Sequence, residues 1–275
     1  MSAPFSAASA PLCWAHRGHS AAFPENTLPA FEAAVAAGAD GVELDVTLSA
    51  DGRLVVIHDA TLERTTNGHG PVSARPWAEL AGLDAGAWFG PQFAGVRLPL
   101  LEEVLEAVGR RVLVNIEIKP EAACVPAWAP GVEPVERQVA ALVRRMGLGR
   151  RVVVSSFNYQ SLITLRSLDA ELPLGVLCEG EANVDFLALL GAIGAASFHP
   201  WLDALDADLA GRVRAAGYGL FPWVYTAANT PEGMARALDL GATGFFANDP
   251  ALFLAARATR AARPTGTAPG TRAGR

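Results

Sequence analysis

The sequence has few cysteines, and their arrangement argues against two kinds of cysteine-dependent structure. Its 275 residues include only three, Cys13, Cys124 and Cys178. The number is odd, the spacings are wide, and no pair has the Cys-x-x-Cys spacing typical of a zinc site. A disulfide framework is therefore not expected, and we predict reduced thiols in a cytoplasmic protein.

The sequence also lacks an excess of positive charge. Its 22 lysines and arginines are outnumbered by 28 acidic residues, which gives a formal net charge of −6 at pH 7. Domains that bind nucleic acid usually carry a basic face, and none is visible here, so we expect no nucleic-acid partner. A local basic site for one phosphate group remains compatible with this composition.

No stretch of the sequence is long and apolar enough to span a membrane. The longest apolar run, at residues 186–198, is shorter than the roughly 20 residues that a spanning helix needs. The first residues, MSAPFSAASAPL, contain no Lys or Arg and do not resemble a signal peptide. We therefore predict a soluble protein, in which residues 263–275 form a disordered tail.

What the sequence does contain is an alternation of short β-rich runs and helical patterns. With 51% hydrophobic residues, residues 10–262 are expected to form one domain with a large core. Strand–helix repetition predicts a parallel sheet, either doubly wound or closed. About eight such units in roughly 250 residues favour an α/β fold of the (β/α)8 type, a TIM barrel. Nine candidate strands are one too many, and the Asp-Gly turn between GVELDVTL and LVVIHD is compatible with a local antiparallel pair.

One segment interrupts this alternation. Residues 60–96 contain no clear strand–helix unit and are rich in turn residues and aromatic residues, as in TTNGHGPV and AGAWFGPQFAG. The segment follows the strand that carries His58, so we expect this insertion over the carboxyl ends of the strands, where the active site of such a barrel lies. We interpret four of its aromatic residues as a lid over the site: Trp77, Trp88, Phe89 and Phe93.

Charged side chains occur within the predicted strands. Glu43 and Asp45 are two residues apart in GVELDVTL, and the strand period of two places both on one face. The same spacing places Glu117 and Lys119 together in NIEIKP. A half-exposed strand edge or an internal salt bridge would explain either pair alone, but not several such strands in one barrel. Carboxylates held together in a dry interior require a compensating cation.

Three carboxylates and two histidines therefore suggest metal-assisted chemistry on a phosphate ester. Oxygen ligands alone suit Mg²⁺ or Ca²⁺, whereas zinc prefers imidazole and thiolate. Basic residues also stand at strand ends: His16 and Arg17 after the first apolar run, and His58 after another. A divalent cation with cationic side chains neutralises charge on a phosphate ester, and imidazoles transfer protons near neutral pH.

With these residues in view, the chain resembles the glycerophosphodiester phosphodiesterases, and most closely their smaller bacterial cytosolic members. The resemblance extends from about Cys13 to Pro250 and rests on long ordered blocks: AHRGHSAAFPENTLPAF, GADGVELDVTLSADGRLVVIHDATLERTTNGHG, LPLLEEVL and NIEIKP. It implies a TIM barrel with an inserted segment. It also implies metal-dependent hydrolysis of a small-molecule glycerophosphodiester to glycerol 3-phosphate and an alcohol, by attack of water or of the neighbouring glycerol hydroxyl.

The resemblance implies a role for each charged residue. The implied ligands of one divalent cation, Mg²⁺ or Ca²⁺, are Glu43, Asp45 and Glu117. The implied general acid and base are His16 and His58. The implied substrate contacts are Arg17 on the phosphate and Lys119 beside it. Glu25 and Asn26 also fit the family pattern, although Asn26 is more simply interpreted as a helix cap.

The last third of the chain departs from the family pattern. WVYTAAN keeps Trp223 but changes the residues after it, and the final strand ends in ANDP. This side of the barrel is expected to line the alcohol or glycerol pocket, with Phe157 and Trp223 as its walls. His19 and His69 do not match the catalytic pair and are interpreted as rim residues.

Two alternatives stay open. A lysophospholipase D would cleave a lipid with one acyl chain and would need an apolar channel, which the aromatic residues of the insertion could supply. A catalytically silent barrel that binds a metabolite would have lost a catalytic histidine or a metal carboxylate, and none is missing here. The oligomeric state is left open.

Overall fold

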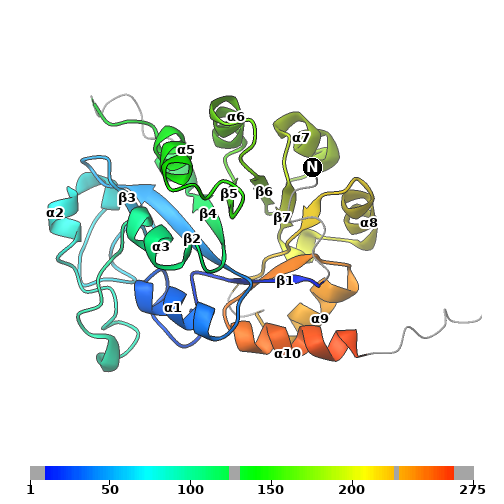
Figure 1. Cartoon of the computed structure of the whole chain (residues 1–275), viewed down its shortest axis with the longest axis horizontal. Coiled ribbons are helices and arrows are strands. Elements are labelled where there is room, and N and C mark those ends of the chain that lie inside the picture. The colour runs from blue at the N-terminus through cyan, green and yellow to red at the C-terminus, as the bar shows by residue number, and fades with distance from the viewer. Residues whose placement is uncertain (1–9, 124–130, 226–228, 263–275) are drawn as a thin grey trace, which may run out of the picture.

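The computed structural model describes residues 10–123, 131–225 and 229–262. Within them, parallel strands curve into a nearly closed barrel with helices around its outside, which confirms the predicted TIM barrel (Figure 1). The predicted tail at 263–275 and Cys124 lie outside the described residues. In the described part of the chain, no helix is both long and apolar enough to cross a membrane.

The strands follow one another around the barrel in a simple order. They are β8 (Gly219–Leu220), β7 (Ser197–Pro200), β6 (Leu174–Cys178), β5 (Val152–Ser156), β4 (Leu113–Ile118), β2 (Gly41–Leu48), β1 (Leu12–Ala15) and β9 (Gly244–Ala247). Each pair of neighbouring strands in this order is parallel, as strand–helix repetition requires. The remaining strand, β3 (Leu54–Val56), pairs antiparallel with β2 and places Val56 opposite Val46. The surplus strand is therefore the local antiparallel pair that the Asp-Gly turn allowed.

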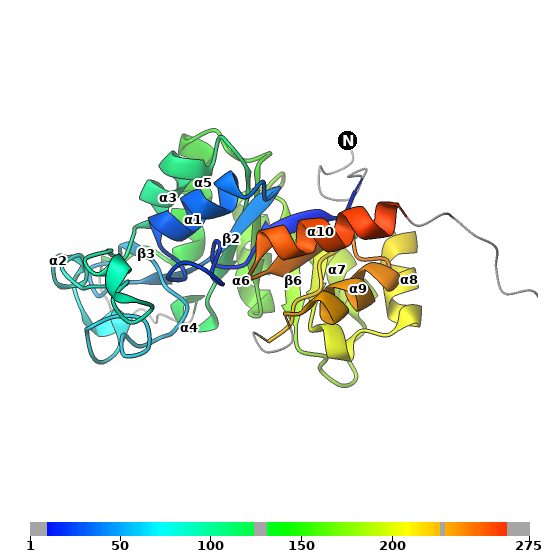
Figure 2. The ribbon, with the colours of Figure 1, turned by 90° about the horizontal axis from the view of Figure 1, so that it is seen from below.

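Helices alternate with the strands and cover the outer face of the barrel (Figure 2). They are α1 (Leu28–Ala36), α3 (Leu101–Val108), α4 (Pro120–Ala123), α5 (Val135–Arg145), α6 (Tyr159–Leu168), α7 (Phe186–Ile193), α8 (Ala207–Ala215), α9 (Pro231–Asp239) and α10 (Pro250–Ala261), with a 3₁₀ turn η3 (Leu202–Ala204). The main core lies between helices and strands, where Leu44 and Val46 of β2 meet Ile116 and Ile118 of β4. The alternate residues of β2 and β4 therefore face the barrel interior.

The floor of the barrel interior is filled by aromatic rings. Trp14 of β1 lies 5.6 Å from Phe221 and 6.4 Å from Phe246, measured between ring centroids, and Val153 joins this cluster. Only glycine fits beside Trp14 at position 41, because a Cβ there would stand 2.5 Å from the indole ring. The barrel interior is thus packed at this end.

The barrel closes incompletely between β8 and β9. LFPWVY is one of the nine candidate strands, but β8 ends at Leu220, and Pro222 has no backbone N–H to continue the pairing. Side chains replace the missing ladder on the β9 side: Asn229 Nδ2 donates to Phe246 O at 2.9 Å, and its Oδ1 accepts from Asn248 N at 3.2 Å. The backbone of Trp223 still donates to Pro200 O at 3.0 Å, which keeps its side chain on the rim of the barrel.

Residues 60–96 form a lobe beside β2 and β3 (Figure 2). The lobe contains η1 (Val72–Ala74), α2 (Trp77–Leu80) and η2 (Pro91–Phe93). It has a small core of its own that continues the buried residues of β3: Val55, Ile57, Leu62, Val72, Leu80, Ala85 and Leu98. This core fixes the lobe to the barrel at β3, directly before His58.

Candidate active site

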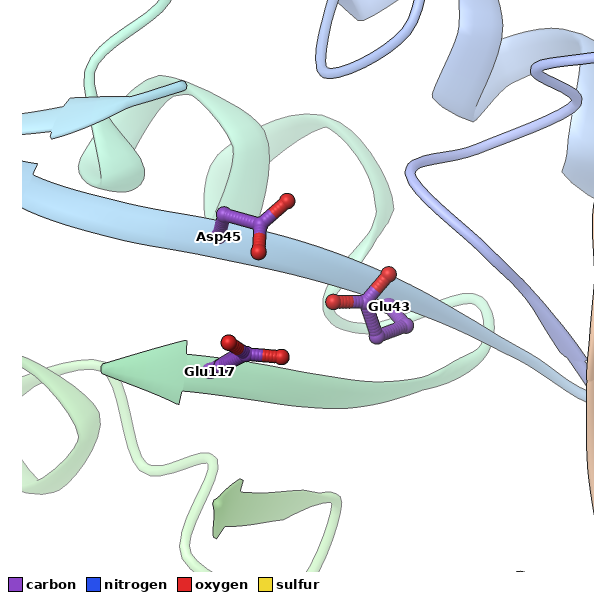
Figure 3. A group of neighbouring side chains, drawn as sticks. All are labelled: Glu43, Asp45 and Glu117. Carbon is purple, nitrogen blue, oxygen red and sulfur yellow. The ribbon is translucent and has the colours of Figure 1, made fainter. Parts of the chain in front are cut away.

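Three carboxylates meet inside the barrel. Glu43 and Asp45 of β2 and Glu117 of β4 each offer one oxygen, and these oxygens lie within 4.8 Å of one another (Figure 3). The meeting follows from strand register, because Asp45 stands opposite Glu117 in the parallel β2–β4 ladder. All three side chains are buried.

The group is electrostatically strained without a cation. Burial raises the pKa of Glu43 well above its ordinary value, and the charges of Asp45 and Glu117 add to the rise. Burial also raises the pKa of Glu117, although Lys119 opposes it. Asp45 differs: burial alone would raise its pKa, but Lys119 and Arg17 outweigh that effect and hold its pKa below the usual range. Three buried oxygen donors without a thiolate or imidazole fit a hard divalent cation.

Two cationic side chains border the carboxylates. Lys119 Nζ lies 2.8 Å from Glu117 Oε1 and 3.4 Å from Asp45 Oδ1. Arg17 Nε lies 3.4 Å from Asp45 Oδ2, on the other side of that carboxylate. The carboxylates raise the pKa of Lys119 despite its burial, so the ammonium is charged in the site.

Arg17 is held in an uncommon backbone conformation. Its φ is 56°, in the left-handed region that residues other than glycine seldom adopt. This conformation lets its backbone N–H donate to Glu43 Oε2 at 2.8 Å, while its Nη1 donates to Glu25 Oε1 at 2.9 Å. These hydrogen bonds offset the backbone strain at Arg17 and order the turn after β1. A strained backbone held by surrounding contacts is common at functional sites.

The two predicted histidines lie on the same side of the barrel but have different surroundings. His16 Nδ1 bonds Asn248 Oδ1 at 2.7 Å, which leaves Nε2 as the nitrogen with a free lone pair. Burial, aided by Arg17, lowers the pKa of His16 to about 4. His58 Nδ1 bonds the Asp59 carboxylate at 2.7 Å and is partly exposed. His16 is therefore neutral at pH 7, whereas His58 has an anionic partner.

Asn26 is not the helix cap that its position suggests. Thr27 occupies the N-cap position of α1, without a side-chain cap bond, and Asn26 is buried with φ 57°. Asn26 Nδ2 donates to Asp45 Oδ2 at 2.8 Å, and its Oδ1 accepts from Asp45 N at 3.2 Å. Asn26 thus orients one carboxylate of the cluster, and sequence reasoning missed this role.

One cavity of about 810 Å³ opens above the cluster. All predicted site residues line it except Asp45, namely His16, Arg17, Glu43, His58, Glu117, Lys119, Phe157 and Trp223. Phe157 and Trp223 meet edge to face with centroids 5.8 Å apart, and Tyr225 lies 5.3 Å beyond Trp223. The lining residues on this half of the barrel that were not predicted include Leu177, Glu179, Glu181, Val224 and Tyr225.

The aromatic residues of the insertion do not form the expected lid. Of the insertion, only Ala60 and Thr61 are among the described residues that line the cavity. Phe93 packs on Phe23 and Phe89 instead, and Trp77 packs against the core of the lobe. The rim interpretation of two other histidines stays compatible with the structure: His69 is exposed, and His19 Nε2 lies 3.6 Å from Asp249 without lining the cavity.

Comparison with known proteins gives a consistent family. The sequence profile of the glycerophosphoryl diester phosphodiesterase family matches residues 16–252. The chain is 40% identical over 241 residues to a glycerophosphodiester phosphodiesterase of Caldanaerobacter subterraneus subsp. tengcongensis, covering 87% of this chain and 94% of that protein. It is 37% identical over 261 residues to the Bacillus subtilis protein of the same name, covering 88% and 85%.

Solved structures agree. A phosphodiesterase from Oleispira antarctica, solved in complex with the product sn-glycerol-3-phosphate, matches with a TM-score of 0.78 and 29% identity over 90% of this chain and 96% of that one. A glycerophosphodiester phosphodiesterase from Agrobacterium tumefaciens matches with a TM-score of 0.74 and 32% identity over 89% and 99%. The profile covers most of the chain, and the barrel carries the acidic cluster that the sequence blocks implied. The chain is therefore a phosphodiesterase that belongs to the glycerophosphoryl diester phosphodiesterase family.

Proposed function

We propose that the protein hydrolyses glycerophosphodiesters to glycerol 3-phosphate and an alcohol with the help of one divalent cation. The observation that carries the proposal is the convergence of a buried carboxylate cluster, two cationic side chains and two histidines on one cavity. The Oleispira antarctica relative with bound glycerol 3-phosphate supports the product.

Glu43, Asp45 and Glu117 would hold the cation, with Asn26 orienting Asp45. We propose Mg²⁺ or Ca²⁺, because the donors are oxygens only. When bound, such an ion supplies Lewis-acid stabilisation of the negative charge that grows on the phosphate. The ion would also offset the burial and the carboxylate repulsion that raise the pKa of Glu43.

Arg17 and Lys119 would bind the phosphate. Both side chains line the cavity, and the carboxylates around them keep both charged. A guanidinium presents paired N–H donors that match two phosphate oxygens, so Arg17 is suited to orient the diester. Lys119 adds a point charge on the β4 side.

His16 and His58 would transfer the protons. His16 is neutral and keeps a free Nε2, so it is suited to accept a proton from the attacking hydroxyl of water or of the glycerol. His58 lines the cavity, and the bond between its Nδ1 and the Asp59 carboxylate orients its ring, so it is suited to donate a proton to the leaving alcohol.

The alcohol would leave along the wall built by β5, β6 and the segment after β8. Phe157 and Trp223 form the aromatic part of that wall, and Tyr225 extends it toward solvent. A lysophospholipase D activity is not favoured, because the aromatic residues of the insertion give no apolar channel to this cavity. A cytoplasmic location is supported by Cys13 and Cys178, which are buried and unpaired as disulfides.

The test is the release of glycerol 3-phosphate from glycerophosphocholine, measured with a coupled enzyme. EDTA should abolish the release, and Mg²⁺ or Ca²⁺ added back should restore it and identify the ion. The same assay on a lysophospholipid tests the alternative. Activity that EDTA leaves intact would refute metal dependence, and faster turnover of the lysophospholipid would refute the proposed substrate class.

A further inference from the structure

Arg64, in the first turns of the insertion, makes two forked ion pairs at once. Its Nε and Nη2 donate to Asp59 Oδ2 and Oδ1 at 2.7 and 2.8 Å. Its Nη1 and Nη2 donate to Glu25 Oε2 and Oε1 at 2.9 and 2.8 Å. Each carboxylate is thus bound by a different edge of one planar guanidinium, a geometry that lysine cannot reproduce.

Each partner of Arg64 is itself bonded to a residue of the proposed site. Asp59 Oδ1 accepts from His58 Nδ1 at 2.7 Å, and Glu25 Oε1 accepts from Arg17 Nη1 at 2.9 Å. The chain of contacts therefore runs from His58, the proposed proton donor, through Arg64 to Arg17, the residue proposed to bind the phosphate. It joins two segments that β1 and β3 carry separately to the cavity.

The arrangement differs from an ordinary surface ion pair. Isolated exposed pairs contribute little, because water screens them and long side chains lose entropy. Here one cation satisfies two carboxylates, of which Glu25 is only 13% exposed. Arg64 is the main cause of the low pKa of Asp59, about 2. The Asp59 charge beside His58 is thereby fixed.

We propose that Arg64 is a positioning residue. Through Asp59 and Glu25, it holds His58 and Arg17 in the relative positions in which both can contact one phosphodiester. Arg64 does not line the cavity, whereas Ala60 and Thr61 of the same turn do. The proposal rests on the proposed roles of His58 and Arg17. The insertion would then contribute to catalysis through the ion pairs of Arg64 with Asp59 and Glu25, and not as an aromatic lid.

The first test is the kinetics of Arg64→Gln, with Arg75→Gln as matched control. Arg75 lies in the same insertion and its side chain is 45% exposed against 43% for Arg64. Within the described ranges of the chain, its side chain pairs with Glu79 and with the backbone of His69, and not with a site residue. Removal of residues that orient metal ligands typically costs 10–100-fold, and by analogy we expect kcat to fall by about that factor in Arg64→Gln and KM to rise. Arg75→Gln should retain wild-type kinetics. Equal kinetics for both variants would overturn the proposal.

The second test asks whether Arg64 acts through its two partners, by double-mutant cycles. In an Asp59→Asn background, Arg64→Gln should cause no further loss of kcat. In a Glu25→Gln background, it should cause no further rise of KM. Full additivity in both backgrounds would show that Arg64 does not act through these carboxylates and would overturn the proposal.

Two further measurements separate positioning from a purely structural role. Arg64→Lys keeps the charge but not the fork, so we expect it to fold like the wild type yet to recover less than half of the lost kcat. Guanidinium at millimolar concentration should partly restore Arg64→Ala, whereas ammonium should not. The proposal would be overturned if the loss of activity were explained by a lowered Tm alone and guanidinium restored no activity. His58→Ala serves as the reference: if it keeps wild-type turnover, the proposed role of His58 fails, independently of Arg64.

Discussion

Asn26 holds Asp45 by two hydrogen bonds at once, one to the carboxylate and one to the backbone N–H of the same residue. The left-handed backbone at Asn26 makes this double contact possible, because it turns the amide back toward β2. A residue that precedes a helix is therefore fixed by a strand 19 positions further along the chain.

Asn26→Gly should weaken metal binding without unfolding the protein. Glycine accepts the positive φ without strain, so the change removes only the amide that orients Asp45. We expect the affinity for Mg²⁺ or Ca²⁺ to fall about 10–100-fold, as for other residues that orient metal ligands. Calorimetric titration measures it, and Asn183→Gly, at an exposed position with φ 67°, is the control. Equal affinities would remove Asn26 from the metal site.

Glu43→Gln should separate stability from metal binding. Burial and the neighbouring carboxylates raise the pKa of Glu43 in the folded protein, so this group destabilises the metal-free protein at pH 7, and the amide, which cannot ionise, should increase the free energy of unfolding in EDTA. With metal present the order should reverse, because one ligand is lost. Urea unfolding in EDTA and in excess Mg²⁺ or Ca²⁺ measures both effects. An unchanged metal titration of activity would exclude Glu43 as a ligand.

His16→Ala and His58→Ala should each lose turnover while they keep the fold. Proton transfer by a positioned side chain typically contributes 10²–10⁴-fold, so kcat should fall by about that factor. His69→Ala, at an exposed position, should behave as the wild type. Circular dichroism and Tm monitor folding, and wild-type turnover in either variant would contradict its acid–base role.

His199 should make the protein sensitive to acid. It is fully buried in the barrel, Ser197 Oγ bonds its Nε2 at 2.8 Å, and burial lowers its pKa from 6.5 to about 3. Below pH 6.5 the unfolded chain therefore binds a proton that the folded chain refuses, so stability falls as pH falls from 6.5 toward 3.

The variant His199→Gln should show a shallower fall by about 1.4 kcal/mol per pH unit between pH 6 and 4. Denaturant unfolding at several pH values measures the slope. An identical slope in both proteins would show that folding does not lower the pKa of His199. His16, whose pKa is also lowered, contributes in the same direction and remains in both proteins.

The elements that sequence reasoning predicted are those whose signal is local. Glu43 and Asp45 share a face because strands have a period of two, and their meeting with Glu117 follows once neighbouring parallel strands are in register. The antiparallel β3 was visible as an Asp-Gly turn between two apolar runs.

What the sequence did not reveal depends on partners far away in the chain. An asparagine before a helix has the same local signal whether it caps the helix or bonds Asp45. Arg64 stands among turn residues, and nothing nearby indicates Glu25, 39 residues earlier, as its partner. The aromatic residues of the insertion suggested a lid, but Phe93 had a partner in Phe23 that only the folded turn after β1 supplies.

The aromatic packing of Trp14, Phe221 and Phe246 at the barrel floor has a kinetic consequence. Phe246 lines the cavity and also belongs to this packed cluster, so the described residues close the cavity at the floor of the barrel. In the proposed reaction, substrate would enter and both products would leave by the same mouth, so a departing product would exclude the next substrate. Glycerol 3-phosphate should therefore inhibit competitively, and turnover should slow as product accumulates around the enzyme.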